Sequence, residues 1–194
     1  EGKNVVVIGG GDTAMDCVRT AIRQNAKSVK CLYRRDKENM PGSAREVSNA
    51  EEEGIEFVWL SSPKEFLGKE NIESIKVNKI KLGEPDESGR RKPEIQNNSE
   101  FILKSDMVIK ALGFDPENLP KLFKAEELKI SKWGTIKIDL KSMQTNLDGV
   151  FGAGDIVRGA SLVVWAIRDG RDAAIQIQKY LQSKIKKQNS EKAA

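Results

Sequence analysis

A glycine-rich turn near the start of the chain is the first place where residue type and spacing suggest chemistry. Gly9, Gly11 and Ala14 form the pattern Gly-x-Gly-x-x-Ala between an apolar run and a segment of helical periodicity. In such a pattern the first glycine permits a tight turn, the second lets the backbone approach a pyrophosphate, and the small third residue lets the helix pack closely on the strand. Free N–H groups at the start of the helix then face the phosphates. The residues assigned to this contact are Gly9, Gly10, Gly11, Asp12, Thr13 and Ala14.

Two arginines follow about 20 residues later, where an NAD-binding protein of this pattern carries an acid for the ribose 2′-hydroxyl. Here the next apolar run ends in Arg34 and Arg35. A carboxylate would repel a 2′-phosphate, whereas a planar guanidinium can hold one through charge-assisted hydrogen bonds. The pair therefore predicts NADP(H), with Lys37 or Arg45 as weaker further candidates. The alternative is that both arginines simply form a solvated strand end.

A third candidate lies near the C-terminus, where the run GVFGAGDI ends in a tight turn that presents the carboxylate of Asp155. A Gly-Ala-Ser sequence then leads into a helix expected from about Leu162. A carboxylate beside a helix N-terminus suits the ribityl chain and ring edge of a flavin. The residues assigned to this contact are Gly154, Asp155, Ser161, Leu162 and Val163. Gly113, where an earlier strand runs into a loop, is a further candidate cofactor-binding residue.

Alternatives remain open for this third candidate. An isolated Gly-Asp pair is more often a turn-former or a helix N-cap than a ligand contact. Trp165 and the helix face formed by Leu162, Ala166 and Ile167 are expected to belong to the core rather than to a cofactor contact.

The residue types that the chain lacks exclude several kinds of catalysis and metal binding. It has no histidine, which excludes Ser-His-Asp and Cys-His catalysis and His-ligated metals. Cys17 and Cys31 lie far apart without a Cys-x-x-Cys motif, so they predict neither a metal site nor a disulfide framework. We therefore predict no catalytic residue and no metal ligand, and we expect a cofactor to carry any reaction.

Charge and hydropathy indicate which partners and which cellular location to expect. The 33 basic and 29 acidic residues are interspersed, which argues against nucleic acid as a partner. No apolar run approaches the about 20 residues that span a membrane, and the first residues lack the apolar stretch of a signal peptide. A cytoplasmic location is the default expectation.

The elements that must position these residues follow from the hydrophobic periodicity. Strands are expected at 4–8, 28–33 and 54–60, with helices at 12–24 and 43–53 between them. Residues 72–82 and 92–103 alternate like antiparallel strands joined by the polar turn GEPDESGRRKP, and 106–114 form a buried strand. Short strands near 128 and 136 and a helix at 160–184 complete the pattern. The complete strand–helix–strand unit favours a dinucleotide site over an ordinary strand-to-helix turn, the alternative for an isolated glycine pattern.

Four segments give the whole chain a family resemblance. They are VVVIGGGDTAMDCVRTAIRQNAKSV, YRRDKENMPGSAREV, GEPDESGRRKPEI and GVFGAGDIVRGASLVVWAIRDGRDAA. Together they resemble the C-terminal part of the small (beta) subunit family of NADPH-dependent glutamate synthase, within the wider class of oxidoreductases that carry an FAD-binding and an NAD(P)-binding domain. The hairpin sequence is the most discriminating of the four.

The resemblance implies an α/β fold in which a Rossmann-like NADP(H)-binding domain, with three layers, a parallel sheet and an antiparallel hairpin, precedes the C-terminal portion of an FAD-binding domain. We expect these at 1–113 and 114–184, with a disordered tail at 185–194. It further implies that Gly9 to Ala14 with Arg34 and Arg35 hold NADPH, and that Asp155 and the turn after it hold the flavin. The chain looks like a piece of something longer, since the family's first FAD motif and its cysteine-rich region, associated with iron–sulfur clusters, precede the matching segment.

The parent protein implied by the resemblance accepts hydride from NADPH onto FAD. It passes electrons through iron–sulfur clusters to the glutamate synthase large (alpha) subunit for glutamate synthesis from 2-oxoglutarate and ammonia. Two alternatives stay open: a related module that serves another acceptor, such as ferredoxin or a pyrimidine, and a fragment that binds NADP(H) without turnover.

Overall fold

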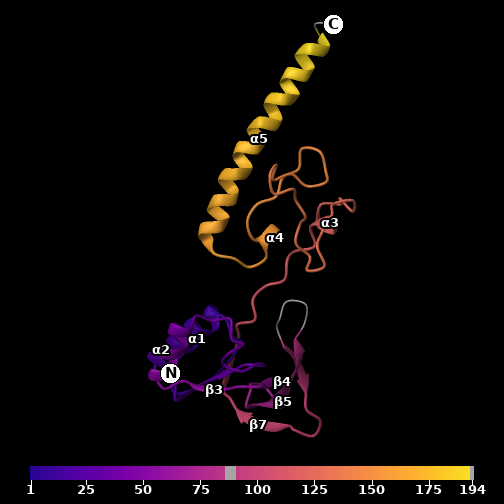
Figure 1. The fold of residues 1–194 in the computed structure, drawn as a ribbon. Helices are drawn as coiled ribbons and strands as arrows, with labels where there is room; N and C mark the ends of the chain where they lie inside the picture. The colour runs from indigo at the N-terminus through magenta and orange to yellow at the C-terminus, as the bar shows by residue number, and fades with distance from the viewer. Residues whose placement is uncertain (86–90, 193–194) are drawn as a thin grey trace. The chain divides into compact units, whose positions relative to one another are not determined.

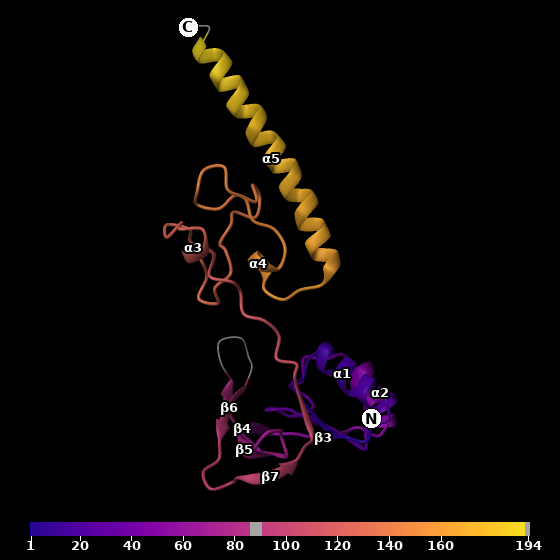
Figure 2. The same ribbon diagram turned by 180° about the vertical axis from the view of Figure 1, so that it is seen from behind.

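The computed structural model describes residues 1–85 and 91–192, and the chain divides into two compact units, Glu1–Leu112 and Gly113–Ala194. The division falls one residue before the predicted limit of the first domain. Residues 86–90 of the predicted polar turn and residues 193–194 of the predicted tail lie outside the described residues. The strands of the first unit and the long helix of the second can be followed in both ribbon views (Figure 1 and Figure 2).

A parallel sheet of four strands in the order β3-β2-β1-β8 forms the centre of the first unit. The elements that build this part are β1 (Asn4–Ile8), α1 (Asp12–Arg23), β2 (Ser28–Leu32), α2 (Ala44–Glu52), β3 (Glu56–Val58) and β8 (Met107–Lys110). In the register of the central strands, Ile8 lies opposite Leu32 and Lys110. The carboxyl ends of β1 and β2 therefore meet at one edge of the sheet, which is where ligands bind in open α/β sheets.

The two faces of β1 are buried against different layers. Val5 and Val7 pack with α1 and α2, whereas Val6 and Ile8 face an antiparallel sheet. A strand covered on both faces reads as a continuous apolar run, which explains the sequence NVVVI. The helices, the parallel sheet and the antiparallel sheet form three layers, and the predicted α/β fold with parallel and antiparallel parts is confirmed.

The antiparallel sheet differs from the prediction in two respects. It contains β4 (Ser61–Leu67), β5 (Ser74–Pro85), β6 (Arg91–Ile95) and β7 (Phe101–Lys104), with β5 pairing with the other three. The predicted strand at 92–103 is two strands, because the chain turns between them at Asn98, whose φ is +54°. β4 was not predicted, since Pro63 and the charged pair that follows it hide its alternation.

The second unit has little regular sheet. Its helices are α3 (Leu119–Leu122), α4 (Asp155–Arg158) and α5 (Val163–Lys192). The short strands predicted near 128 and 136 appear as one isolated bridge, between Ile130 and Ile136. The prediction of a helix end at 184 followed by a disordered tail is wrong for residues 185–192, because α5 continues to Lys192. Lys, Gln and Glu are good helix formers, and this stretch contains no Gly or Pro to end the helix.

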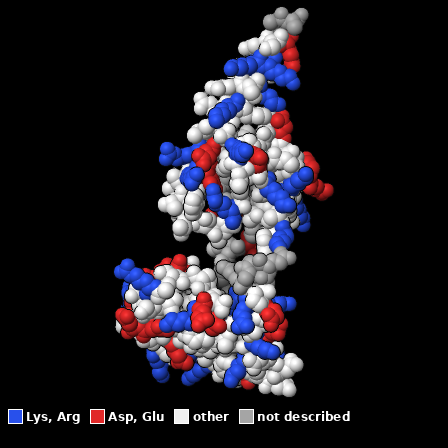
Figure 3. Space-filling model, viewed as in Figure 1, with Lys and Arg blue, Asp and Glu red and all other residues white. Residues whose placement is uncertain are grey.

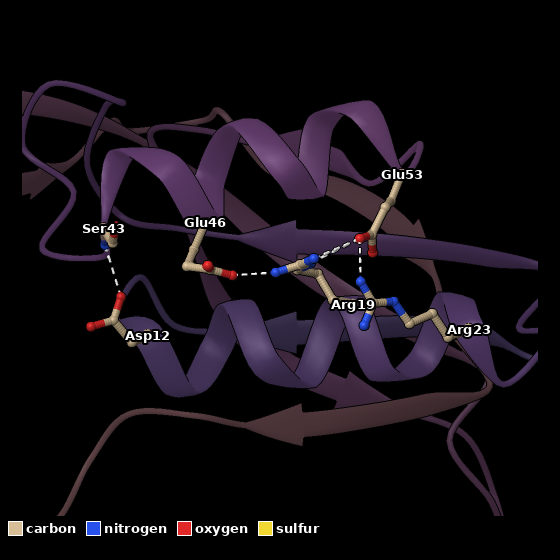
Figure 4. A network of polar contacts seen from close by, with 6 residues as sticks. All are labelled: Asp12, Arg19, Arg23, Ser43, Glu46 and Glu53. Atoms are coloured by element: carbon tan, nitrogen blue, oxygen red, sulfur yellow. Dashed lines mark hydrogen bonds and ion pairs between the residues drawn. The ribbon is translucent and has the colours of Figure 1, made fainter.

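An ion-pair network joins α1 to α2 (Figure 4). Arg19 donates to Glu53 from Nε (3.0 Å) and Nη2 (2.8 Å) and also pairs with Glu46. Arg23 makes a further contact to Glu53 at 2.5 Å. These hydrogen bonds, first that from Arg19 and then that from Arg23, lower the pKa of Glu53 below its ordinary value of 4.5. The network fixes α2, and with it the chain that enters this helix, along the side of α1.

We expect acid to weaken this connection between the helices. A carboxyl whose pKa is lower in the folded state contributes stability above its unfolded value, 4.5 for Glu53, and loses it as the pH falls through the folded pKa. Urea unfolding of the wild type and of Glu53→Gln, near neutral pH and at about pH 3, measures the effect. The wild type should lose more free energy of unfolding than the variant between the two pH values, and equal losses would contradict the assignment.

Candidate functional site

Two of the glycines after β1 are required by the packing of the protein itself. Gly9 has φ +150°, and a Cβ there would lie 2.3 Å from the carbonyl oxygen of Ala111. At Gly10 a Cβ would lie 2.3 Å from Cε2 of Tyr33. The turn therefore runs so close to β8 and to the end of β2 that no side chain fits at either position.

Gly11 is different, because an added Cβ would meet no atom within 4 Å. It is the N-cap of α1, with φ −93° and ψ 178°, and its carbonyl accepts hydrogen bonds from Ala14 (2.9 Å) and Met15 (3.2 Å). Ala14 lies in the first turn of α1 and is fully buried. Open space at the second glycine and a buried small residue at the third position are what the approach of a pyrophosphate to a helix N-terminus needs.

The remaining residues of the motif, Asp12 and Thr13, are exposed in the first turn of α1. The Oδ1 atom of Asp12 accepts a hydrogen bond from the backbone N–H of Ser43 at 2.8 Å. Thr13 lines a hollow of about 290 Å³ along α1, together with Asp16 and Cys17. The Asp12 carboxylate is thus already hydrogen-bonded within the protein.

The structure brings the two arginines to the same sheet edge as the glycine turn, because they follow β2 directly and β2 neighbours β1. Arg35 is half-buried, and its Nε donates to the carbonyl oxygen of Arg91 in β6 at 3.0 Å. Arg34 is exposed, and none of the described groups forms a hydrogen bond or ion pair with its side chain. Arg34 is therefore the guanidinium available to an anion, while Arg35 connects this edge to the antiparallel sheet.

The two weaker candidates for the 2′-phosphate, Lys37 and Arg45, have different surroundings in the structure. Lys37 pairs with Glu51 of α2 at 2.7 Å, so its charge is already matched. Arg45 is exposed in the first turn of α2. The backbone of the intervening segment was not predicted to contact the glycine turn. In the structure, the N–H of Gly42 donates to the carbonyl of Gly10 at 2.9 Å. The Pro41-Gly42 pair, typical of a turn, was the signal that could have pointed to it.

In the second unit, Asp169 fixes the turn at Gly154. This residue was not predicted as part of the site. Gly154 has φ +76° and donates its N–H to Oδ2 of Asp169 at 3.3 Å. Asp169 also accepts two hydrogen bonds from Arg158, at 2.5 and 2.7 Å. The Arg158 hydrogen bond is the main cause of the lowered pKa of Asp169. Asp155 itself is exposed beside this buried anchor.

The start of α5 is exposed, and the expectation that its apolar residues belong to the core is wrong. Leu162 is 66% exposed, Trp165 38% and Ile167 58%, because no described segment of the unit covers this face. Trp165 is flanked instead by the guanidinium groups of Arg158 and Arg168, 4.9 and 5.4 Å from its ring centroid. Ala166, the other residue expected in the core, is exposed as well. The remaining predicted contacts, Ser161, Val163 and Gly113, are also exposed.

Within the described residues, the cysteines and acidic groups form no further candidate site. Among residues 1–85 and 91–192, no cluster of His, Cys, Asp and Glu could hold a metal ion. Burial raises the pKa of Cys31 to about 12, and burial followed by the nearby Asp16 raises that of Cys17. Both thiols are therefore protonated near neutral pH and are poor nucleophiles.

Basic and acidic side chains are mixed on the surface that Figure 3 shows, on the visible face of each unit. None of the helices in the part of the chain that the structure describes is long and apolar enough to cross a membrane.

Comparison with known proteins agrees with this arrangement. The family model described as pyridine nucleotide-disulphide oxidoreductase matches residues 1–170. The chain is 63% identical over 180 residues to the putative glutamate synthase [NADPH] small chain of Cereibacter sphaeroides, covering 93% of this chain and 44% of the relative. It is 61% identical to the glutamate synthase [NADPH] small chain of Azospirillum brasilense, covering 94% of this chain and 38% of that one. The predicted resemblance is confirmed, and the chain spans less than half the length of these relatives.

Solved structures show the same fold. Thioredoxin reductase of Lactococcus lactis aligns with a TM-score of 0.73 at 25% identity, covering 94% of this chain and 54% of that protein. FprA of Mycobacterium tuberculosis, in complex with NADPH, aligns with a TM-score of 0.73 at 17% identity, covering 94% of this chain and 53% of that protein. At such identities the likeness to FprA shows the fold alone.

Proposed function

Because the chain belongs to the pyridine nucleotide-disulphide oxidoreductase family, we propose that its first unit binds NADP(H) and that its second unit contacts the ribityl and ring end of FAD. The observation that carries the first part is the exposed guanidinium of Arg34 at the same sheet edge as the open turn at Gly11. The turn would hold the pyrophosphate, and Arg34 with Arg35 the 2′-phosphate.

The chain's own contribution to the reaction is binding and orientation. A bound FAD would supply the acceptor for hydride from NADPH, and this transfer would need close positioning more than acid–base help. Asp155 would hold the ribityl hydroxyls, and the exposed backbone at Ser161, Leu162 and Val163 would face the ring edge. The buried Asp169 fits this role, since it fixes the Gly154 turn that presents Asp155. No residue of this chain is assigned as a catalytic acid or base.

For the parent protein we propose the role of the glutamate synthase small subunit, an NADPH-dependent flavin oxidoreductase of the cytoplasm. It would pass electrons from FAD, through iron–sulfur clusters held outside this segment, to the large subunit. The identities of 63% and 61% to relatives of that name support the proposal.

A second candidate is the same NADPH-to-FAD module serving another acceptor. It is favoured by a 42% identity over 182 residues to the NADP(+)-dependent formate dehydrogenase subunit beta of Moorella thermoacetica, covering 93% of this chain and 25% of that one. Co-purification of the full-length protein with its partner separates the two: a glutamate synthase large subunit supports the first, and a different redox subunit the second.

We expect the 194-residue chain to bind NADP⁺, to be colourless and to reduce no dye with NADPH. FAD needs a glycine turn at a helix N-terminus for its pyrophosphate, and the turn at Gly11 is assigned to NADP(H). The remaining contacts, at Asp155 and the start of α5, must then offset an association cost of about 4–15 kcal/mol on their own. Calorimetric titration with NADP⁺ and NAD⁺ and an absorbance spectrum of the purified chain test both parts. Absence of NADP⁺ binding would overturn the first part, and stoichiometric yellow flavin the second.

A further inference from the structure

The helices of the first unit cover its parallel sheet unevenly. Val5 and Val7 of β1 are 5% and 0% exposed, because α1 and α2 pack on their side of the sheet. In the register of the sheet, Val5 lies opposite Met107 and Val7 opposite Ile109 of the edge strand β8. Met107 is nevertheless 45% exposed, and Ile109 is only half-buried. The faces of parallel sheets are ordinarily covered by helices on both sides, so the helix side of β8 lacks its cover among the described residues.

The gap beside α1 is a hollow of about 290 Å³. Its floor is apolar and consists of Val5, Met107 and Ile109 of the sheet together with Ala21 and Ala26 at the end of α1. Small-molecule sites in proteins usually have volumes of about 300–1,000 Å³. The hollow is at the lower limit of that range, and its size and floor suit a few apolar side chains better than a separate ligand.

The two flanks of α1 differ in their partners. On one flank, Arg19 and Arg23 form ion pairs with acidic residues of the α2 segment (Figure 4). On the other flank, Thr13, Thr20 and Gln24 line the hollow. None of these three side chains forms a hydrogen bond with a described residue. The flank toward the hollow thus combines an apolar floor with polar groups that have no partner in the part of the chain that the structure describes.

The start of the chain lies at this hollow. Gly2 has φ +67° and donates its N–H to the carbonyl oxygen of Asn25 at 2.8 Å, which fixes the segment beside the end of α1. Glu1, one residue earlier, is among the residues that line the hollow. The chain resembles the C-terminal part of its relatives and spans only 44% and 38% of the two described above. Residues that precede Glu1 in the full-length protein therefore begin next to the uncovered face.

We propose that the segment directly before Glu1 in the full-length protein packs into this hollow, as a third element of the helix layer beside α1, and covers Met107 and Ile109 with apolar side chains. Removal of the apolar floor from water drives the packing. A second copy of the chain or a small molecule would have to offset the loss of translational and rotational freedom on association. A segment that is covalently joined at Glu1 avoids most of that cost, because its effective local concentration is high.

The two cysteines allow a direct test. Cys17 is half-buried and lines the hollow, whereas Cys31 is fully buried in the core of the same unit. We would measure alkylation by N-ethylmaleimide with peptide mass spectrometry in the 194-residue chain and in the full-length protein. Burial and then Asp16 raise the pKa of Cys17, so both proteins are labelled at the same mildly alkaline pH.

Cys17 should react at least about tenfold more slowly in the full-length protein, because its thiol is then accessible only in the fraction of molecules whose segment is detached. Cys31 should stay unreactive in both proteins, which reports that the unit is folded. Equal rates at Cys17 would overturn the proposal.

Met107→Glu in the full-length protein identifies the occupant. The new carboxylate would be buried under the segment, which is unfavourable without a partner, so the alkylation of Cys17 and the hydrogen exchange of the segment before Glu1 should both become faster. Ile102→Glu is the matched control, because Ile102 is an exposed apolar strand residue, 58% exposed, that does not line the hollow. Faster alkylation of Cys17 with unchanged hydrogen exchange before Glu1 would mean that a different segment fills the hollow, and would overturn the proposal.

Thr20→Glu provides a second variant on the helix side of the hollow. Thr20 is exposed, so this change replaces Met107→Glu if a reactive Cys31 shows that the β8 variant is unfolded, and the same two effects are expected. The 194-residue chain separates the other occupants. Alkylation of Cys17 that slows as the protein concentration rises would assign the hollow to a second copy, and alkylation that becomes faster after exhaustive dialysis would assign it to a small molecule. Either result would contradict the proposal.

Discussion

Replacing Arg34 and Arg35 together by alanine is expected to weaken the binding of NADPH to this chain about a hundredfold or more and to leave NADH nearly unchanged. Hydrogen bonds to charged groups contribute about 1.5–3 kcal/mol each, and about 1.4 kcal/mol corresponds to a factor of ten in affinity. Only the 2′-phosphate distinguishes the two nucleotides, so the loss should appear with NADPH alone. Calorimetric titration with both nucleotides measures it.

The single variants should not be equivalent. Arg34 is exposed and unengaged by the described residues, whereas Arg35 already donates to the Arg91 carbonyl. We therefore expect Arg34→Ala to account for most of the loss in NADPH affinity. Arg171→Ala, which removes an exposed arginine of the second unit, is the control for net charge. Equal losses of NADPH and NADH in the double variant would mean that the arginines do not read the 2′-phosphate.

Gly11→Val should abolish measurable nucleotide binding while leaving the protein folded. The Cβ of the new side chain meets no protein atom within 4 Å, so the chain itself tolerates it. The methyl groups then occupy the space through which a pyrophosphate approaches α1. Valine is a poorer N-cap than glycine, which costs about 1 kcal/mol of helix stability. Titration with NADP⁺ and ADP, combined with thermal unfolding, measures both quantities.

Gly9→Ala is the informative counterpart of Gly11→Val. Its Cβ would lie 2.3 Å from the Ala111 carbonyl, at a φ of +150° that side chains rarely adopt, so the loss should be one of folding. If Gly11→Val binds nucleotide with wild-type affinity, the pyrophosphate does not lie on this turn. If both variants unfold alike, the distinction between a ligand glycine and a packing glycine is wrong.

The sequence alone determined the βαβ unit that carries these predictions. Its signals are local: the run NVVVI, the glycine turn, the periodicity over 12–24 and the next apolar run all lie within about thirty residues, and α1 and β2 appear where they predict. The placement of Arg34 beside the glycine turn follows from the same pattern, because neighbouring parallel strands end at one edge. The residues at that edge could therefore be identified without the tertiary structure.

Which of these groups already form hydrogen bonds within the protein could be seen only in the tertiary structure. The Ser43 N–H meets Asp12, and the Arg35 guanidinium meets the Arg91 carbonyl, across 31 and 56 positions of the chain. No local periodicity encodes such pairs. The same holds for the division of 92–103 into β6 and β7, which depends on both pairing with β5.

Which side chains of the second unit are buried could likewise not be predicted from the sequence. The apolar residues at the start of α5 resemble core residues in composition, yet Leu162 and Ile167 are exposed, while the charged Asp169 is buried. Hydrophobicity indicates how much free energy a side chain gains from burial. Whether another segment covers that side chain depends on the path of the whole chain. A buried carboxylate is stable only with partners, and the Gly154 N–H and the Arg158 guanidinium come together with Asp169 only once α5 has packed on the turn.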